Sequence, residues 1–183
     1  MHARTESTAV PMAGVTRADG PVPLEAEVTH LFDELRLPLL RYLSSFGLAA
    51  QDSEEVVQEV FLALFVHLRA GKPRTNIQAW LFRVAHNLGL KRCLLNRKQP
   101  LAEEVLATDT AMNPEQLAAS SQRHQRLLSV VRALPEQDRR CLYLRAEGLR
   151  YREIVSVLGM SLGAVAQSLE RSLEKLGRLD QQL

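Results

Sequence analysis

The stretch from Leu149 to Leu176 constrains the fold most, because it divides into two helical pieces around a single glycine. In the first piece, Ile154, Val155 and Leu158 recur at spacings of three and four, so they share one face of a helix. Gly159 follows, and glycine is the residue that most readily adopts a positive φ past a helix end. Ser161 can cap the second piece, whose apolar positions are Val165, Leu169, Leu173 and Leu176.

This pattern has two interpretations. A helix, a tight turn with glycine and a second helix make a helix-turn-helix, whose second helix lies in the major groove of DNA. An ordinary αα-hairpin inside a helical bundle has the same pattern. The stretch favours neither strongly, so the rest of the chain has to decide between them.

The composition favours a helical protein. Only 5% of the 183 residues are aromatic, whereas strands are usually rich in aromatic and β-branched residues. No run of 18 apolar residues occurs, and the N-terminal residues lack the basic and apolar segments of a secretory signal. We therefore expect a cytoplasmic protein without membrane insertion.

The residue types that carry chemistry are sparse. Cys93 and Cys141 stand alone among helical residues and are expected to be buried thiols. The five histidines show no metal-ligand spacing, and His86 is expected at the surface. No phosphate-binding glycine loop and no nucleophile motif is present. We therefore expect no enzymatic activity, no cofactor, no metal and no small-molecule substrate.

Charge is segregated along the chain. Residues 83–98 carry five Lys or Arg and no acidic residue, a net charge of +5. Residues 99–122 carry four Asp or Glu and no Lys or Arg, a net charge of −4. This distribution predicts one face for a polyanion and a separate acidic connector.

The N-terminal half predicts a tail followed by three helices. Residues 1–24 contain several Pro and Gly without periodicity and are expected to be a disordered tail. A helix begins near Glu25, with a kink or a break at Pro38. A second helix opens at Asp52, which forms a capping box with Glu55. A third helix runs from about residue 77 to residue 96, and its polar side carries the five cations.

The C-terminal half predicts a linker and a second set of helices. Residues 99–122 contain two prolines and many small polar residues, as is typical of a linker. Helical periodicity returns at residue 123, and Pro135 starts a further helix before the helix-Gly-helix stretch. The predicted fold is all-α: two small helical domains, residues 25–98 and 123–183, joined by a flexible acidic linker.

Two segments carry a family resemblance. DSEEVVQEVFLALF, from Asp52, followed by a loop and NIQAWLFRVAHNLGLKR, from Asn76, resembles region 2 of bacterial sigma factors of the extracytoplasmic-function class. ALPEQDRRCLYLRAEGLRYREIVSVLGMSLGAVAQSLERSLEKL, from Ala133, resembles region 4 of the same class. The two segments occur in the order and at the spacing that the family has. The resemblance raises the helix-turn-helix above the αα-hairpin.

The resemblance implies a polymerase-binding helix. The helix from Asp52 to Phe65 matches the part of region 2 that docks on the coiled coil of the largest RNA polymerase subunit. An apolar stripe would hold this helix down while four residues point outward. An ordinary solvated acidic face is the alternative. The implied core-binding residues are Glu55, Gln58, Glu59 and Leu62.

The resemblance also implies an element that reads and opens the promoter minus-10 sequence. An unstacked base needs an apolar or aromatic pocket, and the single strand needs cations. Trp80 fits core packing better than base stacking. The family often has Asp where this chain has Lys91, which adds charge. The implied residues are Asn76, Trp80, Arg83, Asn87, Lys91 and Arg92.

The helix-turn-helix would then contact the minus-35 element. The implied residues are Arg150, Arg152, Ser161, Gln167, Ser168 and Arg171. The family often places polar or cationic residues where this chain has Ala164, Ala166 and Glu170. Because the phosphate contacts dominate DNA affinity, the affinity is expected to depend more on residues 83–98 than on this helix.

The expected function is that of a sigma factor that directs core polymerase to specific promoters and assists DNA opening. The expected partners are the coiled coil of the largest subunit, the flap of the second-largest subunit, promoter DNA and an anti-sigma factor. The alternative is a sigma-like interaction protein that binds core polymerase or an anti-sigma factor without reading minus-35 DNA.

Overall fold

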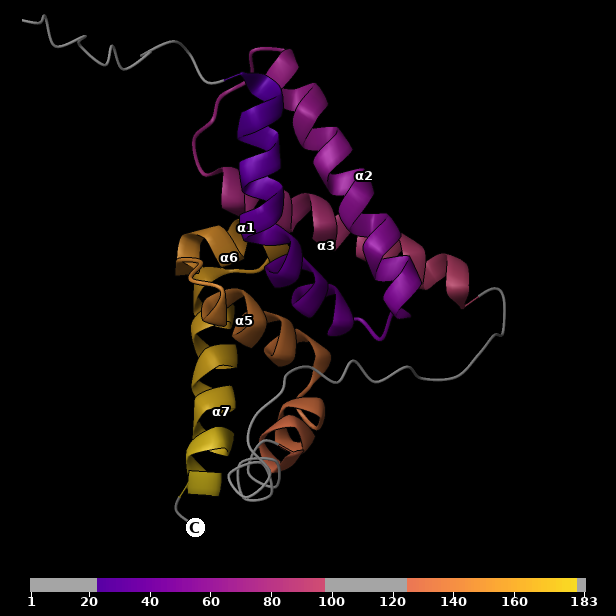
Figure 1. Cartoon of the computed structure of the whole chain (residues 1–183). Helices are drawn as coiled ribbons and strands as arrows, with labels where there is room; N and C mark the ends of the chain where they lie inside the picture. Colours follow the sequence, from indigo (N-terminus) through magenta and orange to yellow (C-terminus); the bar gives the residue numbers. More distant parts are fainter. Residues whose placement is uncertain (1–22, 98–124, 181–183) are drawn as a thin grey trace, which may run out of the picture.

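The computed structural model describes residues 23–97 and 125–180, and within these ranges all regular structure is helical (Figure 1). This confirms the predicted all-α class. The expected N-terminal tail and the linker lie almost entirely outside the described residues. A helical segment covers residues 125–132, and the other helices are α1 (Leu24–Ser44), α2 (Ala50–Arg69), α3 (Ile77–Asn96), α5 (Glu136–Ala146), α6 (Tyr151–Leu158) and α7 (Leu162–Asp180).

The first three helices form the N-terminal module. Helices α1 and α2 pack along each other, and α3 packs against both. Each helix contributes an apolar stripe at helical spacing, because only one face of each is covered. The buried positions include Leu39 and Leu43 of α1, Val57 and Leu64 of α2, and Leu81 of α3.

Helix α1 runs through Pro38 without a break. Of the two predicted outcomes, a kink or a break, the break does not occur, and the ribbon changes direction along its length in Figure 1. Pro38 lacks an N–H group, so the carbonyl of Glu34 loses its helical partner. Glu34 lies on the exposed side, where water can take that hydrogen bond.

Helix α3 has the predicted bounds, whereas α2 begins differently from the prediction. Its first residue is Ala50 and its N-cap is Ala49, so the predicted capping box of Asp52 and Glu55 is wrong. Both carboxylates instead face Arg92 of α3. A long-range ion pair has replaced the local cap.

The C-terminal module consists of residues 125–180, and its centre is the packing of α5 against α7. Gly159 ends α6 at φ 66°, and Ser161 Oγ accepts a hydrogen bond from the N–H of Ala164 at 3.2 Å. Both predictions for this turn are confirmed. Leu173 was predicted on the apolar face of α7 but is 60% exposed.

The buried face of α7 includes two serines that the apolar pattern missed. Val165 and Leu169 are buried as predicted, and Ser168 and Ser172 are buried beside them. Ser172 Oγ donates to the carbonyl of Ser168 at 2.7 Å, so its hydroxyl needs no further partner. Small side chains here let α5 and α7 approach closely.

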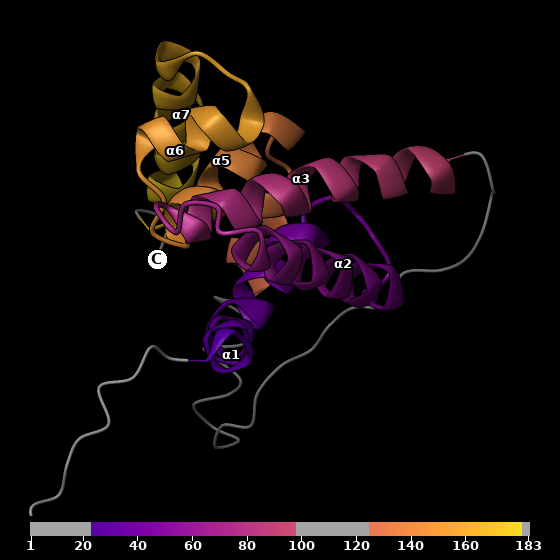
Figure 2. The same ribbon diagram turned by 90° about the horizontal axis from the view of Figure 1, so that it is seen from above.

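The two modules pack against each other, with α3 lying between α1–α2 on one side and α5–α7 on the other (Figure 2). Arg41 Nε and Nη2 bind the carboxylate of Glu147 at 2.9 and 3.1 Å. Arg139 Nη2 donates to the carbonyl of Ser45 at 3.0 Å, at the C-terminal end of α1. The buried apolar cluster runs from one module into the other.

Candidate polymerase and nucleic-acid interfaces

The outward face of α2 holds the predicted polymerase-binding residues. Val56, Val57 and Val60 are buried, which turns Gln58, Glu59 and Leu62 to the surface. Leu62 is 66% exposed, and Val66, one turn further along α2, is 50% exposed. An exposed leucine beside acidic side chains is a surface that suits a partner with apolar and basic groups.

Arg92 of α3 ties this face to the predicted minus-10 element. Its Nη2 lies 2.8 Å from Glu55 Oε2 and 3.8 Å from Glu59 Oε1, and its Nη1 lies 3.3 Å from Asp52 Oδ1. Asn96 Nδ2 also donates to Asp52 Oδ2 at 2.7 Å. Arg92 is therefore engaged with α2 and is less free for a phosphate than the sequence suggested.

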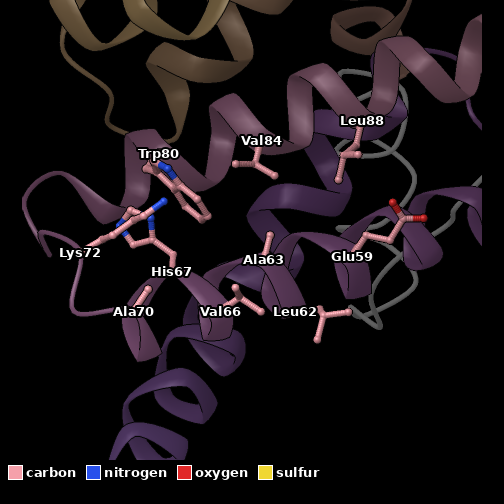
Figure 3. A pocket seen from close by; sticks show the side chains of 10 residues that line it. All are labelled: Glu59, Leu62, Ala63, Val66, His67, Ala70, Lys72, Trp80, Val84 and Leu88. Carbon is pink, nitrogen blue, oxygen red and sulfur yellow. The ribbon is translucent and has the colours of Figure 1, made fainter.

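An apolar groove of about 490 Å³ separates the outer parts of α2 and α3. Figure 3 shows Trp80, Val84 and Leu88 pointing from α3 toward Ala63 and Val66 of α2. Glu59 and Leu62 also line it, and Val66 is 50% exposed. The groove thus connects the predicted polymerase-binding and minus-10 residues, and Trp80 is half-buried at its wall rather than sealed in the core.

The exposed side of α3 and the loop before it carry the other predicted minus-10 residues. Arg83, Asn87 and Lys91 are all exposed. Asn76 adopts the left-handed conformation at φ 55°, and its side chain makes no capping hydrogen bond. Asparagine tolerates this conformation better than most residues. The structure therefore brings an exposed amide and two exposed cations onto one element.

His86, which was expected at the surface, is buried with 7% of its surface exposed. The Tyr42 hydroxyl hydrogen-bonds to its Nδ1 at 2.8 Å, and Phe46 packs edge-on at 5.6 Å between ring centroids. Burial, and then the nearby Arg140 charge, lower the pKa of His86 to about 4. The surface prediction is wrong because α1 and α5 cover this side of α3.

Helix α7, the second helix of the predicted helix-turn-helix, presents fewer polar groups at its surface than its sequence suggested. Gln167 is exposed, but Ser168 is 1% exposed, so it has no surface to offer DNA. Arg171 Nη2 and Nε bind the carboxylate of Asp138 in α5 at 2.7 and 3.1 Å. The Arg171 hydrogen bond holds the pKa of Asp138 below its ordinary value. Arg171 therefore joins two helices.

The arginines before and within α6 remain available. Arg150 and Arg152 are exposed, and the N–H of Arg150 donates to Glu153 Oε2 at 2.6 Å. This hydrogen bond fixes the start of α6 without using the arginine side chains. Ser161 serves as the cap of α7. Two exposed cations therefore lie at the start of α6.

The groups with catalytic or metal-binding chemistry form no site in the part of the chain that the structure describes. No three His, Cys, Asp or Glu side chains gather there in a way that could hold a metal ion. Cys141 is buried and Cys93 is half-buried; burial raises the pKa of both free thiols. Among the described helices, none has the length and apolar character of a membrane span.

Several groove residues were missed from the sequence. Val66, Val84 and Leu88 were not among the predicted site residues, because helical spacing separates the faces of a helix but does not show where two helices diverge. In the structure, the exposure of Val66 and Leu62 shows that α2 and α3 leave an open groove between them.

Comparison with known proteins places both modules in one family. The family model for Sigma-70 region 2 matches residues 31–98, and that for Sigma-70, region 4 matches residues 124–176. The chain is 31% identical over 132 residues to the ECF RNA polymerase sigma factor SigE of Mycolicibacterium smegmatis, covering 68% of this chain and 50% of SigE. It is 26% identical over 137 residues to the ECF RNA polymerase sigma-E factor of Escherichia coli, covering 68% and 72%.

The chain spans half the length of SigE and 32% of the probable RNA polymerase sigma factor RfaY of Xanthomonas campestris. Among solved structures, it resembles CnrH in complex with the cytosolic domain of CnrY, with a TM-score of 0.59, 25% identity and coverage of 86% of this chain and 89% of that one. The fold is also that of RpoE from Bartonella quintana, solved with the anti-sigma factor NepR, at a TM-score of 0.61, 18% identity and coverage of 84% and 98%.

Regions 2 and 4 thus occur in the family's order on two helical modules. SigE and the sigma-E factor are both named as ECF RNA polymerase sigma factors. The chain belongs to the extracytoplasmic-function class of bacterial RNA polymerase sigma factors.

Proposed function

We propose that this chain directs RNA polymerase core to specific promoters and assists DNA opening at initiation. The observation that carries the proposal is the presence of regions 2 and 4, in that order, on one chain whose matching faces are exposed. The match to both regions favours this function over an interaction protein that does not read DNA. The chain would act in the cytoplasm and leave catalysis to the polymerase.

The polymerase contact would lie on α2. Gln58, Glu59 and Leu62 form an exposed face, and the adjoining groove adds the half-exposed Val66. Glu55 lies at the edge of this face, where it binds Arg92. A coiled coil with apolar and basic side chains would bury Leu62 while pairing with the glutamates. The flap of the second-largest subunit would hold the C-terminal module.

The minus-10 contact would lie on α3 and the loop before it. Arg83 and Lys91 can contact phosphates, and Asn76 and Asn87 can donate to base edges. Trp80 lines the groove, so a flipped base would meet the groove wall rather than a free indole. Arg92 would support this surface by joining α3 to α2.

The minus-35 contact would depend on the exposed Arg150, Arg152 and Gln167. Ser161 would contribute by capping α7, and Arg171 by fixing α7 against α5. Ser168 is buried and would not contact DNA. Few direct base contacts remain, which supports a minus-35 site recognised largely by backbone contacts and DNA shape.

The packed arrangement must open for this function. The minus-10 and minus-35 elements are about 25 base pairs apart by their names, which is about 85 Å of duplex. In the described structure α3 packs against α6, and Gln78 of α3 donates to the Glu147 carbonyl at the end of α5 at 2.9 Å, so the proposed minus-10 and minus-35 surfaces lie side by side. Residues 98–124, fully extended, reach about 90 Å, enough to span the two elements.

An anti-sigma factor is a further proposed partner. The similar RpoE of Bartonella quintana was solved with the anti-sigma factor NepR, and CnrH was solved with the cytosolic domain of CnrY. A protein that holds the two modules together would keep the DNA-binding helices side by side. This would block simultaneous contact with both promoter elements.

The test is transcription with core polymerase and a genomic promoter library. Addition of the chain should yield specific transcripts that core polymerase alone does not make. Leu62→Asp should lose core binding, whereas Leu173→Asp, an equally exposed leucine on α7, should keep it. The absence of template-specific transcripts under all conditions would refute the proposed function.

A further inference from the structure

The loop between α2 and α3, residues 70–76, is tied to α1 by an ion pair. The guanidinium of Arg74 faces the carboxylate of Glu27, with Nε 2.9 Å from Oε1 and Nη2 3.1 Å from Oε2. This is the fork geometry in which arginine binds a carboxylate most specifically. Glu27 lies in the first turn of α1, 47 residues earlier in the chain.

Two further features define the shape of the loop. Gly71 at φ 67° and Asn76 at φ 55° turn the backbone at its two ends. The ring of His67 lies 3.1 Å, through its Nε2, from the carbonyl of Pro73. The same ring packs against Trp80, with ring centroids 4.5 Å apart. The loop, the groove wall and the start of α3 are thus connected.

The loop has little apolar packing to hold it. Residues 70–76 are all exposed, so burial contributes little to their order. The described hydrogen bonds from residues 72–74 to the rest of the module are those of Lys72 and Pro73 with His67 of α2, and those of Arg74 with Glu27 of α1. The Glu27–Arg74 ion pair is thus the described side-chain contact that joins the loop to α1, while His67 joins it to α2.

We propose that Glu27 and Arg74 are positioning residues for minus-10 recognition, because their ion pair holds the loop that places Asn76 at the start of α3. The proposal rests on the proposed function. It assigns a role in promoter reading to a residue of α1, outside the predicted DNA-binding set. In this proposal Arg74 affects promoter reading by binding Glu27 and so holding the loop. Direct contact of Arg74 with DNA is the competing explanation.

The experiment uses the full chain with core polymerase on a promoter that the wild type opens. Glu27→Gln and Arg74→Gln each remove the ion pair, and the double variant Glu27→Arg with Arg74→Glu restores it with the charges exchanged. Glu34→Gln is the matched control, because Glu34 is an exposed α1 carboxylate paired only loosely with His30 at 3.9 Å. The readouts are the rate of promoter opening, the preference among minus-10 base substitutions, and the affinity for core.

Both single variants should slow opening by about two- to fivefold, the range that an exposed ion pair supplies. Both should also flatten the minus-10 base preference and leave core affinity and thermal stability near those of the wild type. The exchanged pair should recover most of the rate, and Glu34→Gln should behave as the wild type. A merely structural role would move stability and core affinity together and would not change base preference selectively.

Three results would overturn the proposal. An unchanged opening rate and base preference in Glu27→Gln, with an active wild type, would show that the ion pair positions nothing. A defect in Arg74→Gln alone, without recovery in the exchanged pair, would show direct DNA contact by Arg74. A wild type without promoter-specific transcription would instead refute the proposed function, and this inference with it.

Discussion

At the scale of single residues, His86 shows how a neutral histidine is built into the junction of the two modules. Its ring hydrogen-bonds to Tyr42 and lies near the charge of Arg140 from α5. Burial also raises the pKa of Tyr42, so both partners stay uncharged near neutral pH. Protonation of His86 would place a buried charge beside the Arg140 guanidinium.

We predict that His86 makes the protein less stable as the pH falls from 6.5 toward 4. The unfolded histidine binds a proton below about 6.5, whereas the folded one resists until about 4. The unfolded state therefore binds more protons in this window, and the free energy of unfolding falls by up to about 3 kcal/mol. Urea unfolding at several pH values measures this.

The control for this pH dependence compares two histidine variants. His86→Gln should flatten the dependence between pH 4 and 6.5, whereas His30→Gln, at an exposed position of α1, should leave it unchanged. An equally steep dependence in His86→Gln would contradict the assignment.

A second prediction concerns Asp138, whose carboxylate is buried and bound by Arg171. Asp138→Asn should lower the free energy of unfolding by about 1–3 kcal/mol, because a hydrogen bond between charged groups is lost. Because the pKa of Asp138 lies below its ordinary value, this contribution is present above about pH 4 and is lost below it. The matched variant Glu174→Gln, at an exposed position of α7, should change stability little. Equal effects of the two variants would show that the ion pair is not stabilising.

Residue roles were predictable where they depend on near neighbours. The turn at Gly159 and the cap at Ser161 follow from local backbone chemistry, and both were predicted. Arg92 binds Glu55, 37 residues away, and Arg171 binds Asp138, 33 residues away. Because these partners are distant in the chain, both arginines were predicted to contact DNA. The burial of His86 depends on α1 and α5, which no local pattern reveals.

At the scale of elements, α1 and α3 approach closely at Gly89. A Cβ atom at this position would lie 3.0 Å from Leu43 Cδ2 and 3.4 Å from Phe46 Cε1. Leu43 is fully buried and has little room to move. The glycine therefore serves helix packing, although glycine is unfavourable inside a helix.

We predict that Gly89→Leu lowers the free energy of unfolding by about 1–3 kcal/mol, the usual cost of overpacking a core. Gly177→Ala in α7 should instead be stabilising by about 0.5–1 kcal/mol, because nothing lies within 4 Å of its Cβ position and alanine favours the helix. Urea midpoints compare the two variants. A neutral Gly89→Leu would show that α1 and α3 are not held at this separation.

The positions of the helices along the chain were predicted better than which side chains of each helix are buried. The bounds of α3 follow from strong periodicity between a loop rich in Gly and Pro and the end of the apolar pattern. The sequence left a kink and a break at Pro38 open, and the helix continues because one lost hydrogen bond at a solvated position costs less than the packing around Leu39 and Leu43 supplies. Leu173 was placed inward by periodicity alone, whereas the α5 surface selects Ser168 and Ser172.

At the scale of the whole molecule, the packing of the two modules was not predictable from the sequence. The pattern of helices and the acidic connector indicated two modules, and it contained nothing about their contact. Besides the shared apolar cluster, the contact includes polar pairs such as Arg41 with Glu147, and Arg139 with the end of α1. Arg140 also lies 4.2 Å from the centre of the Phe46 ring, a cation–π contact across the junction.

We propose that the two modules of this chain both bind DNA and separate on the promoter. Fluorescent labels at Ser44→Cys and Ala133→Cys, with Cys93 and Cys141 replaced by serine, report the separation. Both positions are exposed. They lie close together because the guanidinium of Arg139 binds the carbonyl of Ser45, next to Ser44, at 3.0 Å and the carbonyl of Arg132, next to Ala133, at 3.2 Å. The most direct measurement is energy transfer between these labels in the free protein and in a transcribing complex with core polymerase and promoter. High transfer in the free protein and its loss in the complex are predicted, and undiminished transfer in an actively transcribing complex would contradict the account.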